Sequence, residues 1–259
     1  MTDILQQIVA YKRREVAAKA FLGLYRGMED GVRHTPLSMS RRIAESSTGI
    51  IAEFKRRSPS KGEIHPMVMA GSVVAGYERA GAAACSVLTD TPYFGGSLAD
   101  LADARREVSL PLLRKEFIID ERQILEARRY GADAVLLIAS VLTAREIERF
   151  TLTAHHAGLE VLLELHSISE LDKVADGVDM VGVNNRDLTT FEVDIDESMS
   201  MAAQLPRGMV KVAESGLTSM AQIRALRTAG YQGFLMGERF MRHADPAAAL
   251  KDFIDDDRR

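Results

Sequence analysis

The stretch from residue 134 to residue 166 contains an apolar run, AVLLIAS (134–140), a segment with helical spacing, TAREIERFTLTAHHA (143–157), and a second apolar run, EVLLELH (160–166). Short runs rich in valine, isoleucine and leucine are typical of buried strands, whereas apolar residues three or four positions apart are typical of a helix. A strand, a helix and a strand in this order predict a β-α-β unit with parallel strands.

The same alternation continues along the chain. Eight apolar runs can be recognised, and they are Gly49–Lys55, Ala84–Asp90, Pro111–Phe117, Ala134–Ser140, Glu160–His166, Met180–Asn184, Val210–Ser215 and Gly233–Gly237. Helix-like segments lie between them, and two of these, Asp120–Tyr130 and Ser219–Ala229, are directly followed by glycine. Eight βα repeats fit a closed barrel better than an open doubly wound sheet, which has fewer strands. We therefore predict an α/β fold, one (β/α)₈ barrel domain over residues 1–259.

Two further helices are expected at the ends of the chain. Residues 1–48 precede the first strand, and Ile4–Phe21 carries an apolar stripe among basic and acidic residues, which predicts an N-terminal helical extension. This extension plugs the barrel, contacts another copy or contributes to a site. Asp245-Pro246 predicts the start of a last helix that ends at Ile254, and Asp255–Arg259 is expected to be a frayed tail.

Composition excludes several classes of protein. The chain has 259 residues, 46% of them hydrophobic, with a net charge of −4 and no long basic run, which argues against a nucleic-acid partner. The single Cys85 excludes an internal disulfide framework, and the start Met-Thr-Asp-Ile-Leu lacks a leader pattern, so we expect a cytoplasmic protein. Apolar stretches of about seven residues are too short to span a membrane. The six histidines lack metal-ligand spacing, so we expect no metal, and no obligate protein partner is inferred.

Alternation along each strand predicts which charged side chains point into the barrel. In the run 160–166 the apolar set Val161, Leu163 and Leu165 suits the outer face, so Glu164 faces inward with Leu162 and His166. The same reasoning turns further polar residues inward, namely Glu53, Lys55, Lys115, Asn184, Arg186 and Glu214. All of them lie at the carboxyl ends of their strands, where barrel enzymes build their active sites. The alternative, an ion-pair network that only fills the barrel, is disfavoured because the charges gather at one end and are expected to be absent from the other.

The last two strands end in sequences typical of a phosphate site. Glu214-Ser215-Gly216 follows the seventh strand and Met236-Gly237-Glu238 follows the eighth, before a possible short helix. Barrels often bind phosphate between these two loops through backbone N–H groups, to which glycine permits close approach. We therefore predict that a phosphate group is bound by Ser215, Gly216, Gly237 and Glu238.

The first strand carries the most specific motif. IAEFKRRSPSKG (51–62) resembles the Glu-x-Lys-x-x-Ser-Pro-Ser-x-Gly signature of the indole-3-glycerol-phosphate synthases. Further motifs of that family follow in order, namely Leu88-Thr89-Asp90, Tyr93-Phe94-Gly95-Gly96-Ser97, Leu113-Arg114-Lys115, Phe117-Ile118-Ile119-Asp120, Gly182–Leu188 and Glu214-Ser215-Gly216. The resemblance covers essentially the whole chain. It departs from the family at Glu116, usually aspartate, and at Leu165-His166-Ser167, usually Val-His-Asp.

The resemblance implies a reaction and a set of roles. The family closes the indole ring of 1-(2-carboxyphenylamino)-1-deoxyribulose 5-phosphate, with decarboxylation and dehydration and without a cofactor. By analogy, Lys115 is the proton donor for ring closure, and the acid and base work of dehydration is shared among Glu164, Glu53 and Lys55. Asn184 completes the catalytic set. The residues that the resemblance implies for substrate binding are Ser58, Phe94, Phe117, Arg186 and Glu214.

Two rival hypotheses remain at the level of sequence. One is another phosphate-binding barrel of the same pathway, phosphoribosylanthranilate isomerase or the tryptophan synthase α chain, neither of which is known for the first-strand motif. The other is a barrel that only binds a phosphorylated ligand.

Two further features can be predicted. Lys115 should lie within ~4 Å of Glu53, Glu164 or both. The long polar loop Arg56–Met67 should close over the bound substrate.

Overall fold

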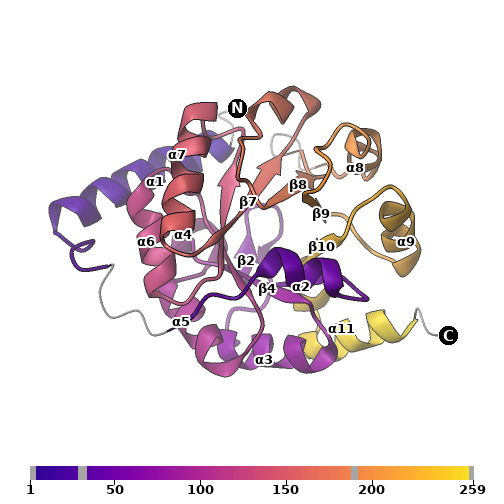
Figure 1. The fold of residues 1–259 in the computed structure, drawn as a ribbon. Helices are drawn as coiled ribbons and strands as arrows, with labels where there is room; N and C mark the ends of the chain where they lie inside the picture. The colour runs from indigo at the N-terminus through magenta and orange to yellow at the C-terminus, as the bar shows by residue number, and fades with distance from the viewer. Residues whose placement is uncertain (1–3, 29–33, 188–191, 257–259) are drawn as a thin grey trace.

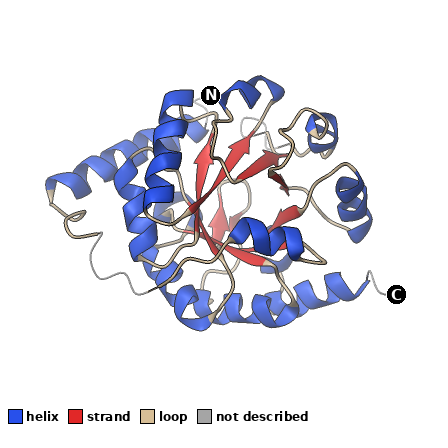
Figure 2. Ribbon diagram, viewed as in Figure 1, coloured by secondary structure: helices blue, strands red, loops and turns tan. Residues whose placement is uncertain are grey.

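A computed structural model describes residues 4–28, 34–187 and 192–256. Its eight parallel strands close into a barrel in the order β1-β10-β9-β8-β7-β6-β5-β4, with helices outside (Figures 1 and 2). The strands are β1 (Ile50–Phe54), β4 (Ala84–Leu88), β5 (Leu112–Lys115), β6 (Ala134–Ile138), β7 (Glu160–Leu165), β8 (Met180–Asn184), β9 (Val210–Glu214) and β10 (Gly233–Met236). The predicted (β/α)₈ barrel is confirmed.

Most predicted strands are one to three residues longer than the observed ones, while β8 is identical. The surplus includes residues at the carboxyl ends such as Lys55, His166 and Gly237, which leave the hydrogen-bonded ladder and enter the loops. The physical reason is that these ends carry polar side chains toward a cavity, where continued strand pairing is not needed.

The helices begin where the sequence offers capping side chains. Asp120, Thr143 and Ser219 each form a capping box with a glutamine or glutamate three residues later, which satisfies N–H groups that the first helical turn leaves free. The helices are α1 (Ile4–Phe21), α2 (Met39–Glu45), α3 (Ala70–Ala80), α4 (Thr91–Phe94), α5 (Leu98–Glu107), α6 (Glu121–Arg129), α7 (Ala144–His156), η1 (Ile168–Lys173), α8 (Asp196–Met201), α9 (Met220–Thr228), α10 (Glu238–Met241) and α11 (Pro246–Asp255).

The predicted alternation of side chains is confirmed by two separate apolar clusters. Val161, Leu163 and Leu165 belong to the large cluster between the strands and the outer helices. Leu162 belongs to a smaller cluster inside the barrel. Burial of both faces explains why these strands are almost continuously apolar.

The amino-terminal mouth of the barrel is closed by α2, which lies in front of the strands in Figure 1. Met39 and Ile43 enter the inner cluster. The carboxylate of Glu160 accepts hydrogen bonds from the hydroxyl of Ser38 (2.6 Å) and the backbone N–H of Ser40 (2.7 Å). The prediction that charges are absent from this end is therefore wrong, because Glu160 shares the inward parity of Glu164 and is stabilised by the start of α2.

The remaining terminal and loop segments differ in part from expectation. The loop after β1 contains a small antiparallel pair, β2 (Arg57–Ser58) and β3 (Gly62–Glu63), where the sequence suggests only a loop. The last helix includes Asp255, so the predicted tail is shorter than expected; residues 257–259, like Leu188 of the family motif, lie outside the described residues. In the described ranges, no helix combines the length and apolar character needed to cross a membrane.

Candidate active site

A cavity of about 280 Å³ opens at the carboxyl ends of the strands. All predicted site residues line it except Glu214, whose side chain is fully buried. The predicted residues on the cavity wall are Glu53, Lys55, Ser58, Phe94, Lys115, Phe117, Glu164, Asn184, Arg186, Ser215, Gly216, Gly237 and Glu238. The structure thus brings together residues from strands that are far apart in the sequence.

Lys115 stands at the centre of three carboxylates. Its Nζ lies 3.6 Å from Glu53 and 3.8 Å from Glu164, which confirms the predicted proximity to both. The nearest partner is Glu214, at 2.8 Å, which the sequence placed only among the substrate-binding residues. Because Glu214 belongs to β9, across the barrel from β5, its contact with Lys115 depends on closure of the barrel and is not visible in local sequence.

The charges in this cluster fix one another's protonation states. Burial disfavours the cation, but attraction by Glu214, Glu53 and Glu164 outweighs it and raises the pKa of Lys115. For Glu164, burial disfavours the anion, but His166 and Lys115 favour it and lower the pKa of Glu164. Lys115 is therefore a cation and Glu164 an anion at neutral pH.

Glu214 behaves differently from its neighbours. Burial and repulsion by Glu164, only partly offset by Lys115, raise the pKa of Glu214 to about 7. In its ionised form, Glu214 accepts a hydrogen bond from Lys115 (2.8 Å), so the protonation of Glu214 near neutral pH alters the charge beside that lysine.

Stability is expected to fall as the pH rises from about 5 to about 8. The pKa of Glu214 is raised from 4.5 to about 7 in the folded protein, so its contribution is complete below about 4.5 and is lost as the pH passes about 7. The loss should be about 3 kcal/mol in the free energy of unfolding. Urea unfolding across this range should give a steeper fall for the wild type than for Glu214→Gln. Burial lowers the pKa of His166, but Glu164 outweighs this effect and raises it. Deprotonation of His166 therefore also lowers stability as the pH rises, so His166→Asn is measured in parallel. Equal slopes in wild type and Glu214→Gln would contradict the prediction.

Two glycines make room for the carboxylates. A Cβ on Gly182 of β8 would lie 2.3 Å from Glu214 Oε1, and a Cβ on Gly237 would lie 2.5 Å from Glu53 Oε1. The sequence suggests that Gly237 permits close approach of a phosphate; the structure shows that it also leaves space for Glu53.

Gly182→Ala is expected to displace the Glu214 carboxylate from Lys115. Glu214 is fully buried, so the added methyl should destabilise the fold by about 1–3 kcal/mol through overpacking. Thermal unfolding and steady-state turnover report the two effects. The double variant Gly182→Ala/Glu214→Asp, whose shorter acid removes the clash, should recover stability. A double variant no more stable than Gly182→Ala would show that the clash is elsewhere.

Glu164 is held from two sides. Its Oε1 accepts a hydrogen bond from the Asn184 side-chain amide (3.2 Å) and lies 3.1 Å from Nε2 of His166. Asn184 Oδ1 in turn accepts a hydrogen bond from the backbone N–H of Arg186 (3.0 Å). Asn184 therefore positions both Glu164 and the start of the next loop. The inward parity of His166 was available from the sequence, but its pairing with Glu164 was not predicted.

An apolar wall borders one side of the cavity. The rings of Phe94 and Phe117 lie with centroids 6.0 Å apart and planes at 35°. Ile4, Leu5 and Ile8 of α1 also line the cavity. Of the three roles open to the N-terminal extension, the structure supports a contribution to the site.

The opposite side of the cavity is suited to an anion. Ser215 has a φ of 66° and is followed by Gly216 with a φ of 76°, a strained turn of the kind found at functional sites. Gly237 immediately precedes α10, whose Arg239 lines the cavity together with Arg242. These two arginines were not predicted, although their position just after the eighth strand was a usable signal.

The Glu238 carboxylate lies 3.8 Å from Lys61 Nζ and 3.7 Å from Arg186 Nη2, so it links two cations from different loops. A role in phosphate binding would therefore fall to its backbone rather than its side chain. Among the described residues, no three His, Cys, Asp or Glu side chains are grouped as metal ligands.

The fold and the site define a (β/α)₈-barrel enzyme with a lysine among three carboxylates, on a cavity that also has an aromatic wall and a glycine-containing turn with positive φ. The family model for indole-3-glycerol phosphate synthase matches residues 5–253. The indole-3-glycerol phosphate synthase of Bacteroides thetaiotaomicron is 46% identical to the chain and covers 98% of both sequences. That of Neisseria meningitidis serogroup B is also 46% identical, over 96% of this chain and 98% of the relative.

The chain belongs to the indole-3-glycerol phosphate synthase family. It is a carboxy-lyase of tryptophan biosynthesis, which decides against the two rival hypotheses. Among solved structures, a mutant tryptophan synthase α-subunit from Pyrococcus furiosus has a TM-score of 0.62 at 14% identity, over 81% of this chain and 97% of that one. A 3-hexulose-6-phosphate synthase has a TM-score of 0.62 at 16% identity, over 79% and 97%. These two likenesses concern the fold alone.

Proposed function

We propose that the cavity converts 1-(2-carboxyphenylamino)-1-deoxyribulose 5-phosphate into indole-3-glycerol phosphate, carbon dioxide and water, with Lys115 as the proton donor for ring closure. The observation that carries this assignment is the position of Lys115, which is protonated at neutral pH and lies on the cavity wall within 4 Å of three carboxylates. A binding protein for an anionic ligand would need the cation but not the surrounding acids.

The chemistry requires groups of both signs. In ring closure, the ring carbon that bears the carboxylate attacks the ketone, and the electron pair of the carbonyl bond moves onto oxygen, which accepts a proton. Loss of carbon dioxide leaves its bonding electrons in the ring and restores aromaticity. The new hydroxyl then leaves as water, while the neighbouring carbon loses a proton and the indole double bond forms. The first step needs a positioned donor, and the last needs an acid and a base.

The residues meet these needs in the following way. Lys115 donates a proton to the ketone oxygen, which becomes negative during ring closure. Glu164 is held as an anion by His166 and Asn184, and it takes part in the proton transfers of dehydration. Glu53 and Lys55 share these transfers, and Lys55 Nζ lies 2.6 Å from Glu53 Oε1.

The rest of the cavity provides binding groups for each part of the substrate. The phosphate fits the turn at Ser215-Gly216 and the backbone at Gly237-Glu238, while the aryl ring fits against Phe94 and Phe117. Further polar side chains, assigned to the carboxylate and hydroxyl groups of the substrate, are Ser58, Asn184 and Arg186. Because the Glu214 side chain is fully buried and contributes nothing to the cavity wall, its proposed effect on the substrate is exerted through Lys115, to which it is hydrogen-bonded. No step requires a cofactor.

The test is direct. Purified protein is mixed with the carboxyanilino substrate in the presence of a chelator, and the appearance of indole fluorescence is followed. Turnover is expected, and it should be abolished by the free product analogue indole-3-propanol phosphate at saturating concentration. Tight binding of the substrate by calorimetry without any fluorescence would leave a binding protein and contradict the proposal.

A further inference from the structure

We propose that Lys12, on the N-terminal helix α1, is a positioning residue for the aromatic wall of the active site. Its buried ammonium joins two carboxylates, Asp90 and Glu116, that fix the backbone on either side of the ring pair Phe94 and Phe117. This inference rests on the proposed function, because it assigns the aromatic wall to the aryl ring of the substrate.

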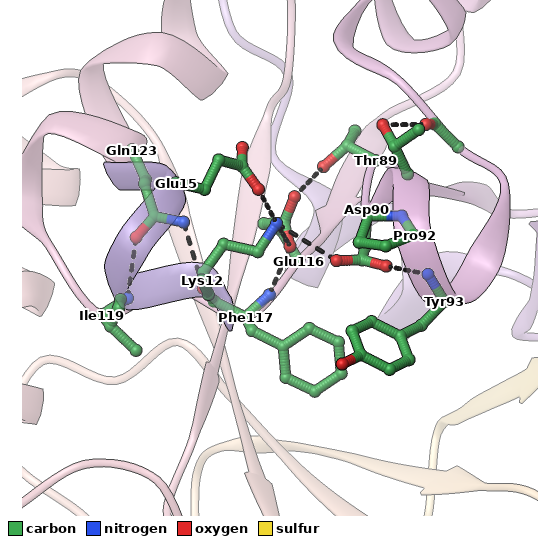
Figure 3. Close-up of polar contacts among 12 residues, drawn as sticks. Lys12, Glu15, Thr89, Asp90, Pro92, Tyr93, Glu116, Phe117, Ile119 and Gln123 are labelled. Atoms are coloured by element: carbon green, nitrogen blue, oxygen red, sulfur yellow. Dashed lines mark hydrogen bonds and ion pairs between the residues drawn. The ribbon is translucent and has the colours of Figure 1, made fainter. Parts of the chain in front are cut away.

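Lys12 lies behind the aromatic wall and cannot reach the substrate, since only 1% of it is exposed. Its Nζ is 3.1 Å from Asp90 Oδ2, 3.1 Å from Glu116 Oε1 and 2.8 Å from Glu15 Oε2 (Figure 3). Glu15 lies on α1 itself, whereas Asp90 follows β4 and Glu116 follows β5. One ammonium therefore connects α1 with two neighbouring loops at the active-site end of the barrel.

The Asp90 carboxylate fixes the backbone of the short helix that carries Phe94. It is the N-cap of α4, and its Oδ1 accepts a hydrogen bond from the backbone N–H of Tyr93 (2.8 Å). The Tyr93 ring packs edge-on against Tyr11 of α1, with centroids 6.2 Å apart. Thus α1 contacts the short helix α4 twice, through Lys12 and through Tyr11, and Phe94 is the last residue of that helix.

The Glu116 carboxylate likewise fixes the backbone of Phe117 through a hydrogen bond. Its Oε1, the atom that faces Lys12, accepts a hydrogen bond from the backbone N–H of Phe117 (2.9 Å). Its Oε2 accepts a hydrogen bond from the Thr89 hydroxyl (2.9 Å). The backbone carbonyl of Phe117 accepts a hydrogen bond from the side chain of Gln123 (3.0 Å), so both the N–H and the C=O group of Phe117 are bound by side chains (Figure 3).

The charge of Lys12 is what keeps the two carboxylates together. Burial disfavours the cation, but attraction by Glu116 and Asp90 outweighs it and raises the pKa of Lys12. Without the ammonium, two nearly unexposed carboxylates would face each other without a shared cation. Repulsion would then move the loops after β4 and β5 apart, and with them the two rings.

The test compares ligands with and without an aryl group. Lys12→Met should raise KM for the substrate about tenfold or more while lowering kcat less, because the ring is bound in the ground state as well as in the transition state. Calorimetry should show a similar weakening for the substrate analogue whose ketone is reduced to an alcohol. Binding of glycerol 3-phosphate, which lacks the ring, should be unchanged. Lys12→Arg keeps the charge and should restore part of the affinity.

Two further variants separate positioning from anchorage of the helix. Lys19 lies on the same helix and pairs with Glu15 and with Glu126 of α6, each at 3.1 Å, so Lys19→Met weakens the attachment of α1 without touching the wall. It should leave both affinities near those of the wild type. Lys12→Met/Glu116→Gln removes one of the two facing carboxylates, the one that also has Arg114 at 3.7 Å, and should bind the aryl analogue better than Lys12→Met. Glu116→Gln alone, a milder change, should show the same ligand selectivity to a smaller extent.

Several outcomes would overturn the inference. It fails if Lys12→Met weakens both ligands equally, if it weakens neither, or if Lys19→Met reproduces its effect. If Lys12→Met does not fold, Glu116→Gln takes its place. An unchanged affinity of Glu116→Gln for the aryl analogue would then overturn the inference. These results are distinct from failure of the proposed function, which would appear as absence of turnover in the wild-type protein.

Discussion

Lys115→Met is expected to lower kcat at least ~10²-fold, by analogy with the loss of one oxyanion donor. The physical reason is that negative charge develops on the ketone oxygen during ring closure, and the ammonium of Lys115 is the cation fixed beside the buried Glu214. Because this charge is absent from the bound substrate, affinity should suffer less than turnover. Single-turnover measurements should show neither carbon dioxide nor indole.

Loss of Lys115 also leaves three carboxylates without their shared cation, which makes unfolding a competing explanation. The variant Lys115→Met/Glu214→Gln removes one of those acids and should regain stability while remaining inactive. Lys211→Met is a matched control, because Lys211 is a barrel-strand lysine that contacts the backbone carbonyl of Ala202 instead of the cavity residues. A Lys115→Met protein that is folded and turns over at the wild-type rate would refute the donor role.

Glu164→Gln is expected to separate decarboxylation from indole formation. Glutamine keeps the shape and can still pair with Asn184, but it cannot take up a proton at neutral pH, so dehydration should slow while ring closure by Lys115 continues. In a single turnover, substrate should disappear and carbon dioxide should be released, with indole fluorescence lagging behind. Lys115→Met is therefore expected to block ring closure, whereas Glu164→Gln is expected to slow a later step, dehydration.

A suitable control lies on the same strand. Glu160→Gln changes the glutamate at the opposite end of β7, which binds Ser38 and Ser40, and it should leave the order and rates of the two signals unchanged. If Glu164→Gln suppressed carbon dioxide and indole in parallel, with no intermediate, then Glu164 would act in ring closure or only orient Lys115. The dehydration role would pass to Glu53 and Lys55.

The sequence alone determined those features that depend on neighbours along the chain. Apolar periodicity located all eight strands, and two-residue alternation assigned Glu53, Lys115 and Glu164 to the interior. Both signals are local, because the direction of a side chain on a strand depends only on its position in that strand. Resemblance to a family supplied the reaction, which no periodicity could have indicated.

Only the tertiary structure decided which of these residues meet. Glu214 approaches Lys115 across the barrel, and its raised pKa follows from complete burial next to Glu164, a property of the closed barrel and not of any segment. At the opposite mouth, the hydrogen-bond partners of the inward Glu160 come from the start of a separate helix, α2, which closes that end. Lys12 was indistinguishable from the other basic residues of its amphipathic helix until packing placed it between Asp90 and Glu116. In each case a charged side chain loses contact with water, which costs free energy, and the fold decides which ion-pair or hydrogen-bond partners offset that cost.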